Sequence, residues 1–462
     1  MSGILLAAFI GVSSANPRYF EDESGKTWIP IGCNICFDRT FDMGADAHGE
    51  VRATFDRWLR TFAANGGNCI RLWGGHPSLE VMPDEAGVYD PETTKTLRGI
   101  VRLCEELGIR IKITLESFRT VNPAGWKGTH QYSVFFNRPL YSRYVKSMHG
   151  FFASEECYRI YMGKAEYLKS LGFGDSPAVY CWELWNEINS LAPMSDYVPW
   201  SDRALADLKR MFPNQMTVQN LGSFSDVGAY RMYDQLATVR DNDFLQVHRY
   251  LDPGACIDAC RGPMDIVAAS ATREMLDRRA DRPVIVAEIG GVKKDHSGPC
   301  AFYPQDKEGA LLHDEVFAPF FCGSAGCGQP WHWDHQYIDG NGLWWQFRRF
   351  ANAIEGLDPV AEGFRPFYTE SRRLRMYGLR GRKTAVLWCR DKFNSWEHEF
   401  VRGDRVELLE HEDVPFRDCT LECYDPWTDR HVRVAAPTLP PFRRSIIVRV
   451  PADAVEGVVR PH

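Results

Sequence analysis

From Ile29 to about Leu357, short apolar or β-branched runs alternate with longer segments whose apolar residues recur at helical spacing. This alternation is typical of successive strand-helix units. The runs that read as strands begin at Ile29, Asn68, Ile109, Val179, Met216, Phe244, Pro283 and Gly328. Eight such units favour a parallel sheet closed into a (β/α)8 TIM barrel, an α/β fold. An open doubly wound sheet is the alternative, but no glycine-rich phosphate loop follows the first strand.

Several of the intervening helices have recognisable ends. One is predicted between a start signal at Asp90 and a stop at Gly108, and another between Ser154 and Gly172. A third is predicted over residues 49–67, where apolar side chains share one helical face. The helical segments therefore fit between the predicted strands as the barrel requires.

The connection after the third predicted strand, from Phe118 to Phe152, is unusually long and aromatic. Between its ends it carries Trp126, His130, Tyr132, Phe135, Phe136, Tyr141 and Tyr144. Long loops in compact domains are usually functional, and this one leaves the end of a strand where barrel active sites are assembled. We expect it to form a wall of a substrate cleft, or else a small hydrophobic core of its own.

After about Phe364 the helical pattern gives way to short alternating segments separated by turns. This pattern predicts a small antiparallel β-sandwich. The predicted organisation is therefore a barrel over residues 1–363, including an N-terminal lead-in strand, and a sandwich domain over residues 364–462.

Composition narrows the choice of ligand. The chain has 462 residues and a formal net charge of −7. We find no cluster of Lys and Arg with interleaved aromatics, which argues against a nucleic-acid partner. The 14 tryptophans and 18 tyrosines favour a carbohydrate ligand, because flat aromatic rings stack on sugars, although an aromatic-rich core would explain them equally well.

The 14 cysteines do not predict a metal site. Some, such as Cys69 and Cys181, lie inside apolar strand-like runs and are interpreted as buried free thiols. The closely spaced pairs are Cys33/Cys36, Cys256/Cys260 and Cys322/Cys327. Each lacks a second pair at zinc-like spacing, so we expect no metal and no other cofactor.

The apolar run from Ile4 to Val12 resembles a signal peptide but lacks a positively charged segment before it. It is too short to span a bilayer, and no other segment approaches the length that a membrane helix needs. We expect a soluble, cytoplasmic protein without a membrane partner. Its oligomeric state is left open.

Two acidic residues end strongly apolar strands, Glu187 in WELWNEIN and Glu288 in VIVAEIGG. A carboxylate in such a place is costly unless it is used or paired. In a barrel the ends of the fourth and seventh strands face one pocket. Two carboxyls about 5 Å apart are the arrangement for retaining glycoside cleavage, in which one protonates the leaving oxygen and the other attacks the anomeric carbon. A structural ion pair is the alternative for either residue alone.

WNE at the end of the fourth strand, with AEIG ending the seventh, resembles clan A of the glycoside hydrolases, and most closely its cellulase and mannanase family, family 5. The resemblance extends from about Arg18 to Leu357. It implies that Glu187 is the acid/base, Glu288 the nucleophile and Asn186 the residue that binds the sugar 2-hydroxyl. The other positions that resemble the family's site residues are Arg71, His248, Tyr250, Trp331 and Trp333.

Residue chemistry suggests roles for these positions. Arg71 and Tyr250 can both donate hydrogen bonds to Glu288 and stabilise its charged form, and the charge of Glu288 should favour a protonated Glu187. Trp331 or Trp333 would form the floor of a sugar subsite, with a core role the alternative for each ring. His248 could equally be a core histidine.

Two further acids lie near the predicted site. Glu183 precedes Glu187 by four residues on the same side of its strand, so we expect it deeper in the barrel and paired with a cation. Glu116, at the end of the third strand, is a rim acid that could touch substrate.

The sequence departs from the family at Ile188, where many members have proline, and in its last segment, which is similar to the small β-domain of more distant clan members. The prediction is a retaining β-glycoside hydrolase, with β-mannosidase or mannanase activity first. A β-glucanase, a β-galactosidase or a non-catalytic carbohydrate-binding barrel are the alternatives. Retention of both Glu187 and Glu288 argues against the binder.

Overall fold

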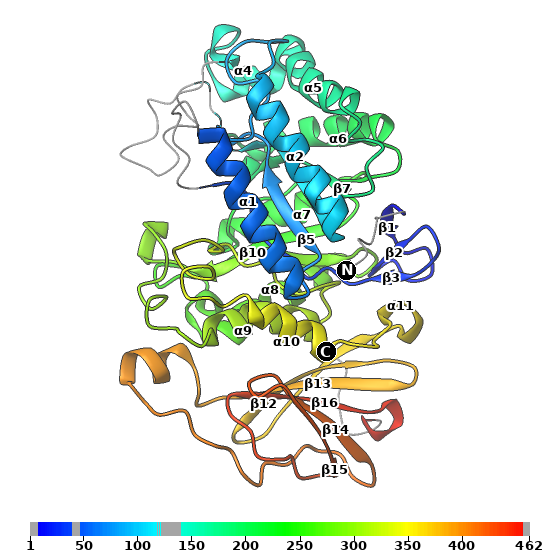
Figure 1. Cartoon of the computed structure of the whole chain (residues 1–462), viewed down its shortest axis with the longest axis vertical. Coiled ribbons are helices and arrows are strands. Elements are labelled where there is room, and N and C mark those ends of the chain that lie inside the picture. The colour runs from blue at the N-terminus through cyan, green and yellow to red at the C-terminus, as the bar shows by residue number, and fades with distance from the viewer. Residues whose placement is uncertain (1–7, 39–46, 118, 120, 122–139, 456–462) are drawn as a thin grey trace.

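The computed structural model describes residues 8–38, 47–117, 119, 121 and 140–455 (Figure 1). Its helices are α1 (Ala47–Ala64), α2 (Pro91–Leu107), α4 (Met148–Ala153), α5 (Glu155–Ser170), α6 (Met194–Met211), α7 (Val227–Leu236), α8 (Met264–Arg278), α9 (Ala310–Phe321), α10 (Trp345–Ala353) and α11 (Pro359–Glu362). Within the described ranges, no helix combines the length and apolar character needed to cross a bilayer.

Two groups of parallel strands form the centre of the molecule. The first is a five-stranded sheet made of β4 (Gly32–Cys33), β5 (Cys69–Trp73), β6 (Arg110–Ser117), β7 (Val179–Asn186) and β8 (Met216–Val218). The second pairs β9 (Leu245–Leu251) with β10 (Val284–Gly291). Seven of the predicted strands are therefore present, each followed in sequence by at least one helix.

The segment predicted as the eighth strand pairs only locally. Pro330 forms an isolated parallel bridge with Ile289 of β10. Its carbonyl also accepts a hydrogen bond of 3.0 Å from the backbone of Asn34, just after β4. Between β8 and β9, the backbone N–H of Phe224, which follows β8, donates a hydrogen bond of 2.8 Å to the carbonyl of His248 in β9. These bonds link the two strand groups at both of their edges.

The helix ends follow from local chemistry. Asp90 caps α2 by accepting hydrogen bonds of 2.9 Å from the backbone of Glu92 and Thr93, and Pro91 occupies the first turn. Gly108 ends the helix in the left-handed conformation, with φ 75°. Ser154 caps α5 in the same way by accepting from the backbone of Cys157. The predicted starts and the glycine stop of α2 are confirmed.

The C-terminal strands form one six-stranded antiparallel sheet in the order β11-β12-β13-β16-β14-β15. They are β11 (Arg365–Glu370), β12 (Leu374–Arg380), β13 (Thr384–Asp391), β14 (Thr420–Asp425), β15 (Arg430–Ala435) and β16 (Ser445–Pro451). In Figure 1 this sheet lies below α9 and α10. Three short strands near the N-terminus, β1 (Ile10–Val12), β2 (Phe20–Asp22) and β3 (Thr27–Trp28), form a separate small sheet.

The prediction of a two-sheet sandwich is wrong for the described part of residues 364–462. One face of the single sheet is covered by side chains from irregular segments, including Leu409, Phe416 and Phe442. These segments pair only through isolated bridges, Leu409 with Phe442 and Asp413 with Thr438. The prolines at 437, 440 and 441 explain this, because proline has no N–H to continue a ladder.

The other face of the sheet packs on the helices beside the parallel strands. The carboxylate of Asp265 in α8 accepts hydrogen bonds of 2.5 and 2.9 Å from Arg375 in β12. Asp314 in α9 accepts two more from Arg390 in β13, at 2.8 and 3.1 Å. Trp388 of β13 shares one hydrophobic core with the parallel strands. The sheet is thus held to the rest of the chain by buried ion pairs as well as by apolar contact.

All 14 cysteines lie among the described residues and none is in a disulfide, as the buried-thiol interpretation expects. Cys256 is exposed and Cys419 is partly buried, while the others are buried. The predicted aromatic wall falls largely outside the described residues, since only Tyr141 and Tyr144 of its aromatic set are described.

Candidate active site

Glu187 stands where β7 ends and the chain turns. The strand is buried along its whole length, and Glu187 follows it in the left-handed conformation, with φ 50°. This conformation is uncommon outside glycine and costs free energy, so the surroundings must hold it. The backbone N–H of Glu187 donates a hydrogen bond of 2.7 Å to Oδ1 of Asn220. The turn leaves 18% of the Glu187 side chain exposed at the strand end.

Glu288 lies within β10 and is nearly inaccessible, with 4% of its side chain exposed. The pairing of β10 with β9 shifts register between Val286 and Glu288. Both carboxylate oxygens are engaged: Arg71 donates from Nη1 to Oε1, and the Tyr250 hydroxyl donates to Oε2 at 2.7 Å. These donors stabilise the ionised carboxylate and fix its orientation.

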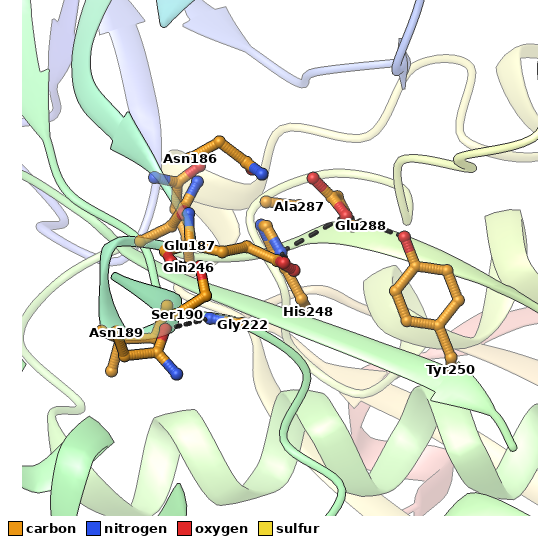
Figure 2. Close-up of polar contacts among 12 residues, drawn as sticks. Asn186, Glu187, Asn189, Ser190, Gly222, Gln246, His248, Tyr250, Ala287 and Glu288 are labelled. Carbon is orange, nitrogen blue, oxygen red and sulfur yellow. Dashed lines mark hydrogen bonds and ion pairs between the residues drawn. The ribbon is translucent and has the colours of Figure 1, made fainter. Parts of the chain in front are cut away.

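His248 of β9 lies between the two acids, as Figure 2 shows. Its Nδ1 atom is 2.8 Å from Oε1 of Glu187 and 3.4 Å from Oε2 of Glu288. Burial lowers the pKa of His248 to about 4, so the imidazole is neutral near pH 7. His248 therefore joins Glu187 through a hydrogen bond rather than as a cation.

The two carboxyl groups lie close together without a direct bond. One carboxylate oxygen of Glu187 and one of Glu288 are within 4.8 Å of each other. Burial raises the pKa of Glu187, and the charge of Glu183 adds to this, while His296 and Arg71 oppose it. The sequence led us to expect that the charge of Glu288 would raise the pKa of Glu187, but burial is the largest cause of the increase. One acid thus accepts hydrogen bonds from two donors, and the other is favoured in its neutral form.

Arg71 organises the deeper part of the site. Its Nη2 atom donates a hydrogen bond of 2.7 Å to Oδ1 of Asn186. Its Nε atom donates a hydrogen bond of 2.9 Å to Oε1 of Glu183. Lys112 of β6 lies 3.2 Å from the other oxygen of Glu183. The expectation that Glu183 lies deeper and pairs with a cation is confirmed, and it pairs with two.

The two tryptophans differ in their surroundings. Trp331 is 6% exposed and its ring lies 5.0 Å from that of Trp73, with an interplanar angle of 39°. Trp333 is fully buried between Phe37 and Trp58, at ring distances of 5.3 and 6.3 Å. Burial of Trp333 favours its core role, since a sugar needs an accessible ring face. Sugar contact by Trp331 stays a prediction.

Glu116 belongs to a separate buried charge network instead of standing free at the rim. Its carboxylate lies 2.9 Å from Lys164 and 3.3 Å from Arg119, and both cations also contact Glu80. All four side chains are 2% exposed or less. We therefore assign Glu116 a structural role, in which its ion pairs support the carboxyl end of β6.

Glu187, His248 and Glu288 each offer one atom that a metal ion could use. The surroundings do not fit a cation. Both oxygens of Glu288 already accept hydrogen bonds, and the Arg71 guanidinium at Oε1 repels positive charge. The arrangement instead suits chemistry done by the carboxyl groups themselves.

Sequence reasoning missed His296, which lies beside the site after β10. Its Nε2 atom is 3.1 Å from Oδ2 of Asp252, which follows β9. The only sequence signal was position, because both residues lie in segments that follow strands bearing predicted site residues. Asn220, which holds the backbone of Glu187, was also missed, although it lies within the fifth predicted strand.

Neither a family model nor a curated protein matches the sequence. Several solved structures match the fold. A structure described as a glycoside hydrolase has a TM-score of 0.60 at 11% identity, covering 96% of this chain and 96% of that one. A family 5 glycoside hydrolase from Bacteroides vulgatus has a TM-score of 0.59 at 11% identity, covering 97% and 94%.

The exo-β-1,4-mannosidase of Opitutaceae bacterium strain TAV5 has a TM-score of 0.50 at 18% identity. That match covers 73% of this chain and 57% of the mannosidase. The first two matches cover nearly all of both chains, so they include the C-terminal sheet as well as the parallel strands. The chain therefore has the fold of family 5 glycoside hydrolase structures.

Proposed function

We propose that this protein is a retaining β-glycoside hydrolase that cleaves β-linked sugars by double displacement. The observation that carries the proposal is the pair formed by Glu187 and Glu288, whose oxygens approach within 4.8 Å. Retaining enzymes hold their two carboxyls about 5 Å apart, whereas inverting enzymes need a gap of roughly 6.5 Å or more for a water molecule. A protein that only binds sugar would need neither the spacing nor the donors to Glu288.

In the first step, Glu288 attacks the anomeric carbon and Glu187 protonates the departing oxygen. Arg71 and Tyr250 donate hydrogen bonds that orient the Glu288 carboxylate, and burial raises the pKa of Glu187, which favours its protonated form. The glycosidic bond breaks, and an ester forms between the sugar and Glu288. In the second step, Glu187, now ionised, takes a proton from water as the water oxygen attacks the anomeric carbon and Glu288 leaves.

Asn186 and His248 have supporting roles in this scheme. Oδ1 of Asn186 accepts from Arg71, so the side-chain amide nitrogen is the group that would bind the sugar 2-hydroxyl. The neutral imidazole of His248 orients Glu187 through the 2.8 Å contact. Trp331 would supply the aromatic surface of a subsite beside them.

For the substrate, we propose a β-mannan-like chain or its oligosaccharides. Two observations support this proposal: the sequence WELWNE at the end of the fourth predicted strand, and the likeness in fold to a structure described as an exo-β-1,4-mannosidase. β-Glucans and β-galactosides differ from mannosides only in hydroxyl configuration, so they are the other outcomes that a substrate panel must distinguish.

For the architecture, we propose that the parallel strands close into a (β/α)8 barrel over residues 1–363, with 364–462 as an accessory domain. Closure is supported by the backbone bonds from Phe224 to His248 and from Asn34 to Pro330, which link the two strand groups at both edges. The ion pairs of Asp265 and Asp314 then fix the accessory sheet to the barrel.

The proposal is tested by a panel of aryl β-glycosides together with β-mannan, β-glucan and xylan. The wild-type protein should hydrolyse β-mannoside members fastest, with and without EDTA. Glu288→Gln should be inactive on every member, whereas Glu410→Gln, at an exposed position on the C-terminal part, should match wild type. No hydrolysis by the wild type of any member would contradict the function, and loss of activity in EDTA would contradict metal-free catalysis.

A further inference from the structure

The segment after β10 folds back over the candidate site as a short hairpin. Val292 forms an antiparallel bridge with Pro299, and the backbone of Lys293 donates 2.9 Å to the carbonyl of Gly298. His296 lies inside this hairpin, in a short 3-10 turn over Lys294–His296. Because Glu288 is on the strand that leads into it, the hairpin stands at the same end of the sheet as both acids.

The backbone and the partners of His296 fix its position. Its φ of 52° places it in the left-handed region, which side chains other than glycine adopt only at a cost. The Nε2 atom lies 3.1 Å from Oδ2 of Asp252, which is 4% exposed. The ring meets Tyr250 edge to face, with centroids 5.5 Å apart at 77°. Tyr250 in turn donates to Glu288, so a single ring separates His296 from that carboxylate.

His296 is nonetheless open to a ligand. Its side chain is 39% exposed, in contrast to the buried His248. With Nε2 engaged by Asp252, the other ring nitrogen, Nδ1, has no hydrogen-bond partner among the described residues and is left for a hydroxyl group of a ligand. Neutral imidazole accepts there, and protonated imidazole donates, so either form can bind a sugar hydroxyl.

The charge of His296 also reaches Glu187. Burial is the main cause that raises the pKa of Glu187, and His296 is the largest of the influences that lower it, ahead of Arg71. The groups that face Glu187 are His248 from β9, Glu288 from β10, Glu183 from its own strand, Arg71 from β5 and His296 from the hairpin. Those that face His296 are Asp252 and Tyr250, both from the end of β9.

We propose that His296 is a substrate-binding residue of this site, held by Asp252, and that it contacts a hydroxyl of the sugar bound between Glu187 and Tyr250. This inference rests on the proposed function and adds to it a contact from outside the strands. A hairpin residue in this place can differ between enzymes that share the strand residues. It is therefore a candidate determinant of which sugar is accepted.

The test compares His296→Ala and His296→Gln with wild type on the best oligosaccharide of the panel. Loss of one hydrogen bond should lower kcat/KM about threefold to tenfold for His296→Ala, mostly through KM. Because His296 lowers the pKa of Glu187, its removal should let Glu187 keep its proton to higher pH and move the basic limb of kcat/KM to higher pH. His296→Gln should bind the oligosaccharide better than His296→Ala does, because the amide can form the hydrogen bond. Its basic limb of kcat/KM should stay at the higher pH of His296→Ala.

Asp252→Asn should reproduce the loss in part, because a neutral amide holds the His296 ring less firmly than the carboxylate does, while the Oδ1 atom of the new side chain can still accept from Gly254. His431→Gln, at an exposed histidine of β15, is the matched control and should equal wild type. Thermal melts identify any variant that is misfolded, and in that case His296→Gln and Asp252→Asn are compared instead. Unchanged KM and pH profile in folded His296 variants would overturn the inference, whereas an inactive wild type would overturn the proposed function.

Discussion

The hydroxyl of Tyr250 donates a hydrogen bond of 2.7 Å to Oε2 of Glu288, while Arg71 occupies Oε1 of the same carboxylate. A hydrogen bond to a charged group is worth about 1.5–3 kcal/mol. Tyr250→Phe should therefore lower kcat/KM about 10- to 100-fold and leave the fold intact. Tyr368→Phe in β11 serves as the control for loss of a tyrosine hydroxyl. Equal rates for the two variants would show that Tyr250 does not support the reaction.

Removal of the proposed nucleophile should abolish turnover but not folding. Glu288→Ala takes away a charge that the site uses, and the room it leaves admits a small anion. Azide or formate should then restore hydrolysis of an activated β-glycoside, and azide should give the α-glycosyl azide, because a single displacement inverts the anomeric carbon. Near-normal activity of Glu288→Ala without an added anion would remove Glu288 from the mechanism.

Glu183 should matter for stability as well as for the position of Arg71. Burial opposes its ionisation, but Arg71 and Lys112 hold the pKa of Glu183 well below its ordinary value. Breaking such a buried pair costs about 3–5 kcal/mol, so Glu183→Gln should lower the free energy of unfolding by that amount at neutral pH. The double variant Glu183→Gln/Lys112→Met should recover part of the loss, since it leaves no unpaired lysine.

The pH dependence of that loss has a definite sign. A lowered folded-state pKa stabilises the protein above the ordinary glutamate pKa, and this contribution is lost only as the pH falls through the lowered value. Wild type and Glu183→Gln should therefore converge in stability only in strong acid. Glu422→Gln, which breaks an exposed pair with Arg433, should change stability by less than about 1 kcal/mol and is the control. Equal urea midpoints for the two variants would contradict the argument.

The main features of the site could be predicted because they depend on strand ends. Parallel strands bring their carboxyl ends to one edge of a sheet, so acids that end two apolar strands must lie near each other. The same alternation along β7 placed Glu183 below Glu187 and required a cation beside it. The identity of that cation could not be predicted, and the structure supplies two, Arg71 and Lys112.

Features that depend on packing between distant segments could not be predicted. His296 and Asp252 meet through a hairpin whose shape no local pattern encodes. Trp331 and Trp333 share one motif, yet Trp331 keeps 6% of its surface exposed while Trp333 is fully buried. The expected sandwich failed for a related reason. Alternating residues predict strands, but the prolines near Phe442 decide that the covering segments stay irregular.

The stereochemistry of the first product distinguishes the two mechanisms open to a pair of acids. Because a carboxylate oxygen of Glu187 lies within 4.8 Å of one of Glu288, we expect two displacements and net retention. Proton NMR during the early reaction should show the β anomer first, followed by slow mutarotation. Initial appearance of the α anomer would require a water molecule between the acids and would rule out the covalent intermediate.

The acid/base role of Glu187 predicts a dependence on the leaving group. Burial raises the pKa of Glu187, so its protonated form persists to higher pH than that of an ordinary glutamate, and the rate of the first step falls as the pH rises through the raised pKa. Glu187→Ala should lose this basic limb. It should be severely impaired on natural sugars and much less so on a dinitrophenyl glycoside, whose leaving group needs no proton.

The second step supplies an independent readout of the same residue. Without Glu187 no base activates water, so the glycosyl ester on Glu288 should accumulate and be visible by mass spectrometry. Azide needs no base and should release it as the β-glycosyl azide, the opposite anomer to that formed by Glu288→Ala. Asn189→Ala, in the turn that follows Glu187, controls for disturbance of that turn, because its Oδ1 accepts from the backbone of Gly222 at 2.7 Å. An equal loss on every leaving group, with no trapped ester and no azide product, would mean that Glu187 is not the acid/base. Glu183 and Glu116 are both buried and ion-paired, so neither has the access to a bound sugar that the partly exposed Glu187 has.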